Sequence, residues 1–459
     1  MTGCFGGILR RSPLASTIAL LAISLAATSA LAGDAPDAAP LLTLDGAIRL
    51  AIEGNRTLKI AELEVSKSEE ALASAGTRRW PAFSTSVLAS QLLTPIDFGF
   101  SQGAFGTYPV IGPIPAHDTD IHTPLRPVFH IEGEVTQPIS QLHKIHLGLQ
   151  SQSVAIAAAR EQVRAQRQLL ADNVKQAYYA VLQSESARQA ANSFLEEFQE
   201  IDRLVAQRLA QESALKSDSL DVKAKLANQR YKLAQLDHRL SSQKEYLNNL
   251  LGRDLRTEFQ TQPVPPLAPL ETSLTDAQQA ALAHRPEIKV AELSSQQADY
   301  ARRLARAEYV PDVGFAVRYL SSFNVNLLPS NIAMAGLELT WEPWDWGRRR
   351  HDVNVQKLTL EQSRQKLQET QNQVLLEVNG NFRKLQEGRL MLDACEIARE
   401  AAHEKLRVVT NQYSEQAALL GDVLQQTAGV AAAEDSYQQA LLAFWTAKAD
   451  FEKSLGEDQ

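Results

Sequence analysis

The sequence predicts an α+β membrane protein in which one fold unit, made of long α-helical hairpins and transmembrane β-strands, occurs twice in tandem. Three observations predict this fold class. Residues 134–252 align without a gap on residues 338–456 when the numbering is shifted by 204. Unusually long helical segments carry apolar residues at coiled-coil spacing. Four short segments between the helices alternate apolar and polar residues, as transmembrane strands do.

The tandem repeat extends beyond this alignment. A shift of 230 places Ala61-Glu62-Leu63 on Ala291-Glu292-Leu293 and Pro81 on Pro311. The two shifts differ by 26 residues, so the first copy carries an insertion of that length between Pro81 and Glu134. A repeat this long indicates two duplicated halves of one fold. We expect a signal peptide over residues 1–32, a first repeat over 33–252, a proline-rich linker over 253–272 and a second repeat over 273–459.

The first 32 residues have the pattern of a secretory signal. Arg10 and Arg11 precede a mostly apolar run over residues 14–27, and Ala30-Leu31-Ala32 is a small-x-small cleavage site. The alternative is an uncleaved membrane anchor, for which the apolar run is short. Beyond this segment we find no uninterrupted apolar run of about 18 residues. If the chain crosses a membrane, it therefore does so as β-strands.

The net charge argues against a nucleic-acid-binding protein, and the cysteine count argues against a disulfide-stabilised one. The full chain has a net charge of −8, and removal of the two arginines of the signal makes it −10, so nothing favours a nucleic-acid partner. Only Cys395 remains after cleavage, which leaves no intrachain disulfide. An exported chain without disulfides must be held together by packing and assembly.

Each copy of the repeat predicts a set of three helices. In the first copy they cover residues 44–79, 142–211 and 218–251, and Gly252 ends the last one. The middle helix has about 70 residues, roughly 105 Å at 1.5 Å per residue. The two shorter helices together have the same length, so they could stack end to end beside the long one. The returning helix has an apolar seam with seven-residue spacing, formed by Leu226, Leu233, Leu240 and Leu247.

Four alternating segments predict the strands. They are centred on residues 83–89, 129–135, 313–319 and 337–341. An ordinary half-buried sheet would show the same alternation. Transmembrane strands are favoured because four of the five tryptophans stand where strands meet helices, as in an interfacial aromatic belt. These tryptophans are Trp80, Trp341, Trp344 and Trp346.

Four strands cannot close a barrel in lipid. Bacterial barrels need at least eight strands, and an open sheet edge is not tolerated in the hydrocarbon region. The chain must therefore oligomerise. A dimer would supply eight strands and a trimer twelve, and the strand count alone does not choose between them.

With these features the chain resembles the TolC-like outer membrane efflux family. Leu42-Thr43-Leu44-Asp45 opens the first helix, and Glu342-Pro343-Trp344-Asp345-Trp346-Gly347-Arg348-Arg349-Arg350 follows the last strand. Residues 214–220 and 413–424 match the family at the two helical hairpins. The likeness covers roughly residues 41–456. The resemblance implies a homotrimer that forms a 12-stranded β-barrel in the outer membrane above a long periplasmic helical tunnel.

The resemblance also implies a function and partners. Such a protein is the export duct of a tripartite efflux or type I secretion system, with no catalytic site and no cofactor or metal. Its partners are a periplasmic adaptor (membrane fusion) protein, an inner-membrane pump of the RND, ABC or MFS type, and outer membrane lipid. The alternative is a periplasmic coiled-coil structural or adaptor protein with no channel of its own. Drugs, metals, small organic molecules and polypeptides all remain possible cargoes.

The family places a gate at the helical tips, built from a tyrosine, an arginine and acidic residues. By resemblance Tyr413 is the tyrosine, Asp422 is the first acid, and Asp218 is its counterpart in the first copy. Three Asp422 carboxylates near one axis would attract cations. The alternative is that both acids are only N-caps of the returning helices.

This chain departs from the family pattern at the tips. The usual arginine position holds Ala418 and the second acid position holds Gln425. The glycine common at such hairpins is Glu212 in the first copy and Gln416 in the second. The gate is therefore expected to be weaker or built differently.

Two further features of the sequence are a histidine cluster and the insertion of the first copy. Five of the nine histidines fall between residues 117 and 146, and His143 and His146 lie one helical turn apart. A metal site would need three or four converging ligands, which this spacing does not ensure. The 26-residue insertion lengthens the first strand-to-strand loop and is expected to lie outside the cell. No catalytic motif is found, so an enzyme is not expected.

Overall fold

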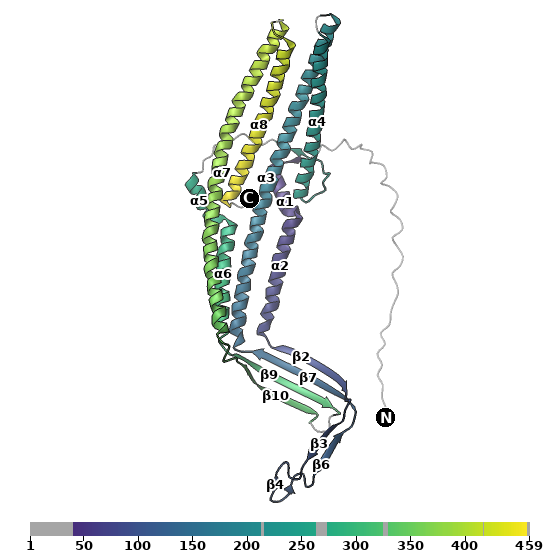
Figure 1. The fold of residues 1–459 in the computed structure, drawn as a ribbon, viewed down its shortest axis with the longest axis vertical. Helices are drawn as coiled ribbons and strands as arrows, with labels where there is room; N and C mark the ends of the chain where they lie inside the picture. The colour runs from purple at the N-terminus through teal and green to yellow at the C-terminus, as the bar shows by residue number, and fades with distance from the viewer. Residues whose placement is uncertain (1–39, 213–214, 263–272, 325–328, 416, 457–459) are drawn as a thin grey trace, which may run out of the picture.

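The structure of the chain is a computed structural model that describes residues 40–212, 215–262, 273–324, 329–415 and 417–456. The expected signal peptide and half of the proline-rich linker, residues 263–272, lie outside the described residues. The molecule is elongated, with long helices at one end, a β-sheet at the other, and a narrow β-structured extension beyond the sheet (Figure 1). The predicted combination of long helical hairpins and a four-stranded sheet is confirmed.

The order of elements repeats along the chain. The first part contains β1 Leu41–Leu42, α1 Leu44–Gly54, α2 Arg56–Gly76, the 3-10 helix η1 Thr77–Arg79, β2 Ala82–Gln91, β3 Ile96–Phe100, β4 Thr107–Tyr108, β5 Gly112–Pro113, β6 Thr119–Thr123, β7 Pro127–Pro138, α3 Gln141–Ala210, α4 Lys216–Leu250 and β8 Gln260–Thr261. The second part contains α5 Leu274–His284, α6 Pro286–Ala307, β9 Asp312–Phe323, β10 Asn331–Thr340, α7 Arg348–Ser414 and α8 Leu420–Leu455.

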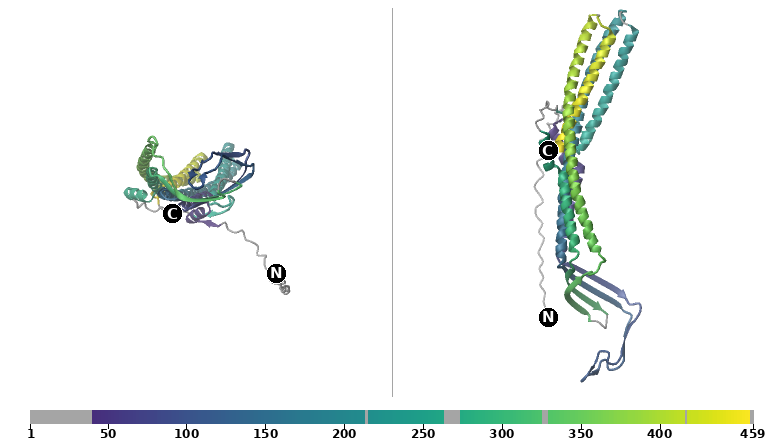
Figure 2. Two further views of the ribbon diagram at one scale, coloured as in Figure 1. Left: turned by 90° about the horizontal axis from the view of Figure 1, so that it is seen from below. Right: turned by 60° about the vertical axis from the view of Figure 1, so that its left-hand side comes forward.

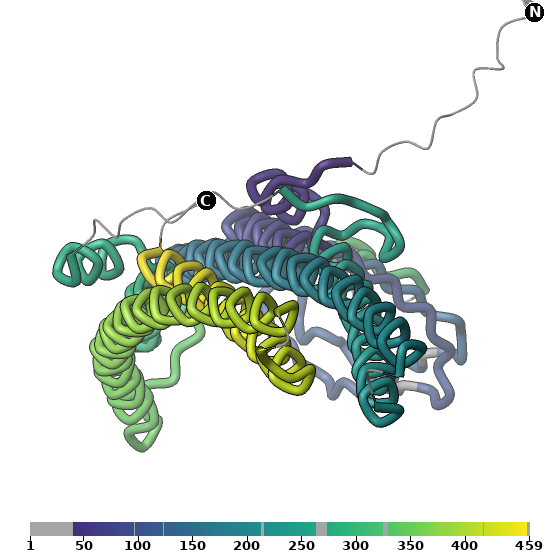
Figure 3. The backbone as a smooth tube through the Cα atoms, turned by 90° about the horizontal axis from the view of Figure 1, so that it is seen from above, coloured from purple at the N-terminus to yellow at the C-terminus, as the bar shows by residue number. Residues whose placement is uncertain are grey.

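The helices form one curved layer. Helix α3 is 70 residues long, as predicted, and packs against α4 along one part of its length and against α2 along the other (Figure 1). Helix α7 is accompanied in the same way by α8 and α6. Helices α6 and α8 also contact α3 and so join the two parts of the chain. Seen along the long axis, the layer is a crescent (Figure 3).

The first helix is not continuous over residues 44–79, which corrects the prediction. Asn55 has extended backbone angles, ends α1 and caps α2 by accepting a hydrogen bond from the Leu58 N–H at 3.1 Å. Its side-chain amide donates to the Leu250 carbonyl at 3.0 Å. The helix is interrupted here because the end of α4 packs directly against the backbone of this turn. A Cβ on Gly54 would lie only 2.4 Å from the Leu251 carbonyl oxygen. Arg285 makes the equivalent break between α5 and α6.

The predicted seam of α4 is buried at its two ends, Leu226 and Leu247, and half-buried at Leu233 and Leu240. In α8, Val430, Phe444 and Phe451 lie in the interior. A buried hydrophobic cluster lies where α4 and α8 end beside the α1–α2 and α5–α6 breaks and the middle of α3 and α7.

Tyr178 of α3, 1% exposed, is central to that cluster. Its hydroxyl donates to the Leu42 carbonyl at 2.8 Å and accepts from the Gln262 N–H at 2.9 Å. These bonds fix the short parallel pair β1–β8 to the long helix.

The sheet has the antiparallel order β10-β9-β7-β2, so β2 and β10 are its edges. Its register brings the four predicted segments into line. Phe83, Val135, Val317 and Ala335 lie in one row on the apolar face, and Ser84, Glu134, Arg318 and Met334 lie in the next row on the other face. Opposite residues of neighbouring strands share a face. The register therefore places the predicted apolar sets on one face, while the other face is mainly polar and also carries Leu88, Leu320 and Met334.

Among the described residues, no helix combines the length and the apolar character that a membrane span requires.

Candidate functional site

The turn at the first helical tip has the backbone of a glycine turn, and Gln416 of the second tip lies outside the described residues. Helix α3 ends at Ala210 and α4 begins at Lys216, while α7 ends at Ser414 and α8 begins at Leu420. Glu212 has a φ of 57°, in the left-handed region that glycine adopts at least cost. The backbone thus keeps the conformation for which a glycine is usual, although this chain has a glutamate there.

Asp218 and Asp422 cap the returning helices. Both stand at the third helical position, and their Oδ2 atoms accept the Leu215 N–H at 3.2 Å and the Leu419 N–H at 3.0 Å. These N–H groups precede the helices and have no intrahelical partner. These contacts are those of the alternative role, helix capping. Both acids stand inside the helix and accept from the backbone N–H of the residue before it, instead of occupying the N-cap position themselves. Asp422 is exposed, so its charge also faces solvent.

Tyr413 joins the two hairpins. The Arg208 guanidinium carbon lies 4.3 Å from the centre of the Tyr413 ring, a cation–π contact between the last turns of α3 and α7. Arg208 did not emerge from the sequence, because the family pattern placed the arginine at the position of Ala418. One signal was present: a shift of 204 pairs Tyr413 with Leu209, so Arg208 stands at the same level of the first hairpin.

The four junction tryptophans all lie at the helix end of the sheet. Trp80 precedes the edge strand β2, and Trp341, Trp344 and Trp346 follow the other edge strand, β10. Their side chains are exposed, from 56% for Trp341 to 88% for Trp346. The structure therefore brings them to one level at opposite edges of the sheet, which is compatible with an interfacial belt.

The corner between β10 and α7 explains the motif that contains these tryptophans. Trp346 and Gly347 both have left-handed backbone, with φ of 55° and 87°. Asp345 stabilises the turn by accepting the Gly347 N–H at 3.0 Å and the Arg349 N–H at 3.1 Å. The hydrogen bond from Arg349 holds the pKa of the Asp345 carboxyl below its usual value. Arg348 binds Glu342 at 2.7 Å and closes the corner.

The polar face of the sheet carries a charge cluster. Arg318 of β9 lies 2.7 Å from Glu134 of β7 and 3.4 Å from Glu338 of β10. His130 and Ser322 form a hydrogen-bonded pair at 3.0 Å nearer the outer end. Such groups suit a water-filled interior better than lipid.

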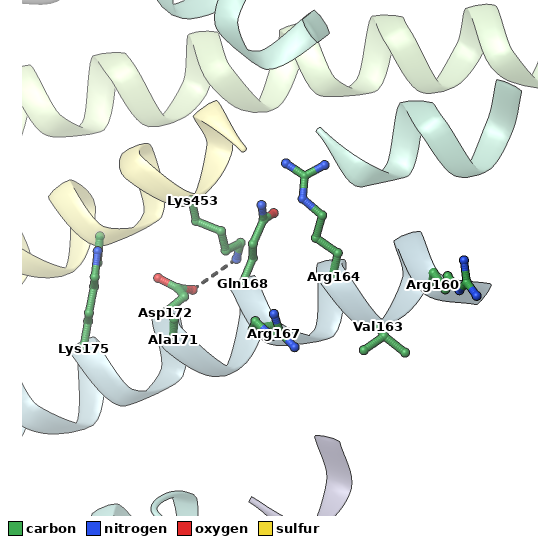
Figure 4. A pocket seen from close by; sticks show the side chains of 10 residues that line it. Arg160, Val163, Arg164, Arg167, Gln168, Ala171, Asp172, Lys175 and Lys453 are labelled. Carbon is green, nitrogen blue, oxygen red and sulfur yellow. Dashed lines mark hydrogen bonds and ion pairs between the residues drawn. The ribbon is translucent and has the colours of Figure 1, made fainter. Parts of the chain in front are cut away.

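A second polar site lies midway along α3. A pocket of about 250 Å³ opens where α8 ends against α3 (Figure 4). Four of its cationic side chains have acidic partners: Arg160 with Glu69, Arg167 with Glu62, Lys175 with Glu452 and Lys453 with Asp172. These four ion pairs tie α3 to α2 and α8, so the pocket lies at a joint between helices.

The histidines do not converge. His122 pairs with Asp97 at 2.8 Å in the extension beyond the sheet, whereas His143 and His146 lie in the first turns of α3. Within the described ranges, no three His, Cys, Asp or Glu side chains are grouped so that they could hold a metal ion. The metal alternative gains no support from this arrangement.

Comparison with known proteins supports the family resemblance in the second copy of the repeat. Residues 277–457 match the family model described as outer membrane efflux protein. The resemblance to the outer membrane efflux family is confirmed. Among curated proteins, none matches the chain.

Several solved outer membrane channels share the whole fold. The Campylobacter jejuni CmeC channel has a TM-score of 0.74 at 16% identity, over 90% of this chain and 85% of that one. The Vibrio cholerae outer membrane protein VceC has a TM-score of 0.70 at 16% identity, over 90% and 96%. The open state of the Neisseria gonorrhoeae MtrE channel has a TM-score of 0.69 at 16% identity, over 90% and 88%. These findings agree with the predicted outer-membrane location.

Proposed function

We propose that three copies of the chain close into an export duct across the outer membrane and periplasm. The observation that carries the proposal is the sheet: it has one apolar face, one charged face and two edge strands, β2 and β10. Strand β2 runs away from the helices and β10 runs back toward them, so β2 of one copy can pair antiparallel with β10 of the next. Closure would remove the edges that lipid does not tolerate.

The two faces of the sheet support the same arrangement. Phe83, Val87 and Leu337 are strongly exposed on the apolar face, where a closed barrel would present them to lipid. The charge cluster around Arg318 would face the water-filled interior. The number of copies comes from the family resemblance, because the geometry of one sheet requires oligomerisation without choosing three.

The helical layer supports a periplasmic tunnel with partners at its tips. We infer that an adaptor protein and an inner-membrane pump of the RND, ABC or MFS type engage the duct, in a tripartite efflux or type I secretion system. The tryptophan belt of Trp80, Trp341, Trp344 and Trp346 would mark the membrane boundary next to the helices.

Two measurements on the purified protein test the duct. It should leave isolated outer membranes only in detergent, and in planar lipid bilayers it should produce discrete conductance steps. Release from membranes by salt or alkaline washing, together with the absence of conductance, would instead favour the soluble coiled-coil alternative.

The gate proposal rests on Asp422 and Tyr413, with Asp218 as the first-copy counterpart. Replacing Asp422 by Asn removes the charge but keeps an oxygen that can accept the Leu419 N–H. A charged ring raises the local cation concentration on the order of tenfold, so Asp422→Asn should weaken block by divalent cations by about that factor. Asp435→Asn, an exposed acid further along α8, is the control. Unchanged block in Asp422→Asn would leave Asp422 a helix cap alone.

A further inference from the structure

The insertion of the first copy forms a defined arm beyond the sheet. This outer arm, residues 92–126, contains β3 paired with β6 and β4 paired with β5. It does not continue in the direction of β2 and β7 but turns back beneath the outer end of the sheet (Figure 1). In the end-on view of Figure 2 it lies within the outline of the crescent. An arm so placed lies over the opening that the curved sheet would enclose in a closed assembly.

The end of the arm is held in one shape. The Phe105 N–H donates to the Ile114 carbonyl at 2.9 Å, and the Ile114 N–H donates to the Gly106 carbonyl at 2.9 Å. The ring centres of Phe98 and Phe100 are 6.4 Å apart, and those of Phe100 and Phe105 are 5.0 Å apart. These contacts make the arm a preorganised surface, which lowers the entropy cost of docking.

The tip of this ordered arm is apolar and bare. Val110 is 95% exposed, Ile111 73%, Phe105 58% and Tyr108 49%. An isolated two-stranded ribbon is marginally stable in water, and exposed apolar side chains gathered at one place indicate a surface that another surface covers.

The charges of the arm identify the occupant. Residues 98–116 contain no charged residue and no histidine, whereas Asp97, Asp118 and Asp120 stand on the stem. Residues 81–125 contain no lysine or arginine, so an anionic lipid surface would repel the arm. An uncharged tip can meet identical tips without repulsion. The surface therefore fits a second copy of itself.

We propose that Phe105, Tyr108, Val110 and Ile111 dock against the same tip of neighbouring copies, so that the outer arms meet over the outer mouth of the duct. This proposal rests on the proposed assembly of several copies around one axis. It makes the outer mouth an apolar constriction, separate from the charged tips at the far end of the helices.

Cross-linking at the tip tests the contact. Val110→Cys in a Cys395→Ser background should give disulfide-linked dimers after mild oxidation in the outer membrane. The yield should not fall when the membranes are diluted, because the contact lies within one assembly. Thr119→Cys, exposed on the stem, is the matched control and should stay monomeric on the denaturing gel.

A second variant tests the consequence. Val110→Glu with Ile111→Glu places like charges at the tips, and the single-channel conductance should rise relative to the parent protein. If Val110→Cys forms conducting oligomers but no linked dimers, the arm contact is wrong while the duct stands. If the protein forms neither conducting nor detergent-stable oligomers, the duct proposal fails first.

Discussion

At the scale of single residues, Asp172 and Asp450 lie at the contact between α3 and α8, and the side-chain amide of Gln176 donates to both. Gln176 donates to Asp172 at 3.2 Å and to Asp450 at 3.0 Å. Asp172 is 3% exposed, and its Oδ1 has no hydrogen-bond partner within the described structure. Lys453 binds the other oxygen of Asp172 at 3.1 Å (Figure 4). Burial, followed by the negative charge of Asp172, raises the pKa of Asp450.

This raised pKa predicts a pH-dependent cost. An acid whose folded-state pKa lies above its unfolded value stabilises the fold at low pH, and that contribution is lost as pH rises through the folded pKa. Asp450→Asn keeps an acceptor for Gln176 and removes the charge. Although Lys453 and Lys384 offset part of the cost, and Glu377 adds to it, the variant should melt at a higher temperature than the parent at pH 7.

The pH dependence provides the check on this prediction. Thermal unfolding followed by circular dichroism should show the difference at pH 7 and lose it near pH 2.5, well below the ordinary aspartate pKa of 3.8, where the carboxyl is protonated in both states. Asp435→Asn, an exposed acid on the same helix, should change neither value. A lower melting temperature for Asp450→Asn at pH 7 would contradict the predicted sign.

The candidate gate could be predicted only in part at this scale. Asp218 and Asp422 were assigned to the gate by resemblance to the family at the hairpin motifs, whereas their alternative role as helix caps rests on a local signal, a short acidic side chain near a helix start. Arg208 was not, since its contact with Tyr413 joins residues about 200 positions apart and only the tandem repeat relates their positions. Nothing local in the sequence distinguishes Arg208 from the other arginines of α3.

At the scale of elements, two glycines show how helix ends are joined. Gly252 has a φ of 71°, and a Cβ there would lie 2.2 Å from the Gly54 carbonyl oxygen. Gly456 occupies the equivalent place beside Arg285, with a φ of 77° and a nearest approach of 2.9 Å. The end of each returning helix therefore packs backbone to backbone against the break between two shorter helices. Close approach and positive φ both require glycine here.

Gly252→Ala should therefore weaken the first of these joints. The left-handed backbone alone costs about 1 kcal/mol, and the clash with Gly54 raises the loss to about 2 kcal/mol or more. Thermal unfolding in detergent should show a clear fall in melting temperature. The control is Gly429→Ala within α8, where nothing lies within 4 Å, and which should stabilise the helix by about 0.5–1 kcal/mol. Equal melting temperatures for Gly252→Ala and the parent would disprove the joint.

Elements whose pattern is local were predicted well. The lengths of α3 and α4 and the four strands of the main sheet follow from apolar spacing at periods of 3.5 and 2. The break at Asn55 did not, because Gly54 and Asn55 do not stop a helix by themselves. The pairs β3–β6 and β4–β5 were also missed, since glycines and prolines interrupt their alternation.

At the scale of the whole molecule, the tandem repeat predicts contacts between copies. Within one chain, α3 packs on α8, and Gln176 meets Asp450 there at 3.0 Å. In the other copy of the repeat, position 176 corresponds to Gly380 of α7, 204 residues later, and position 450 corresponds to Tyr246 of α4, 204 residues earlier. Tyr246 is 54% exposed, and a Cβ on Gly380 would meet nothing within 4 Å. Where one chain has the pair Gln176 and Asp450, the corresponding pair is thus an exposed tyrosine and a glycine with open space above it.

We therefore expect Tyr246 of one chain to lie on Gly380 of the neighbouring chain in the assembly. With Cys395 changed to Ser, a chain carrying both Tyr246→Cys and Gly380→Cys should be joined by a short bis-maleimide into covalent trimers, because each copy contributes one residue to each neighbour. Either cysteine alone should give no linked product. Pairing Tyr246→Cys with Met391→Cys is the distance control, since Met391 lies eleven residues further along α7, about 16 Å at 1.5 Å per residue. Linked dimers that never extend to trimers would show that the chains do not pack as the tandem repeat predicts. An unlinked double variant would place Tyr246 outside the interface.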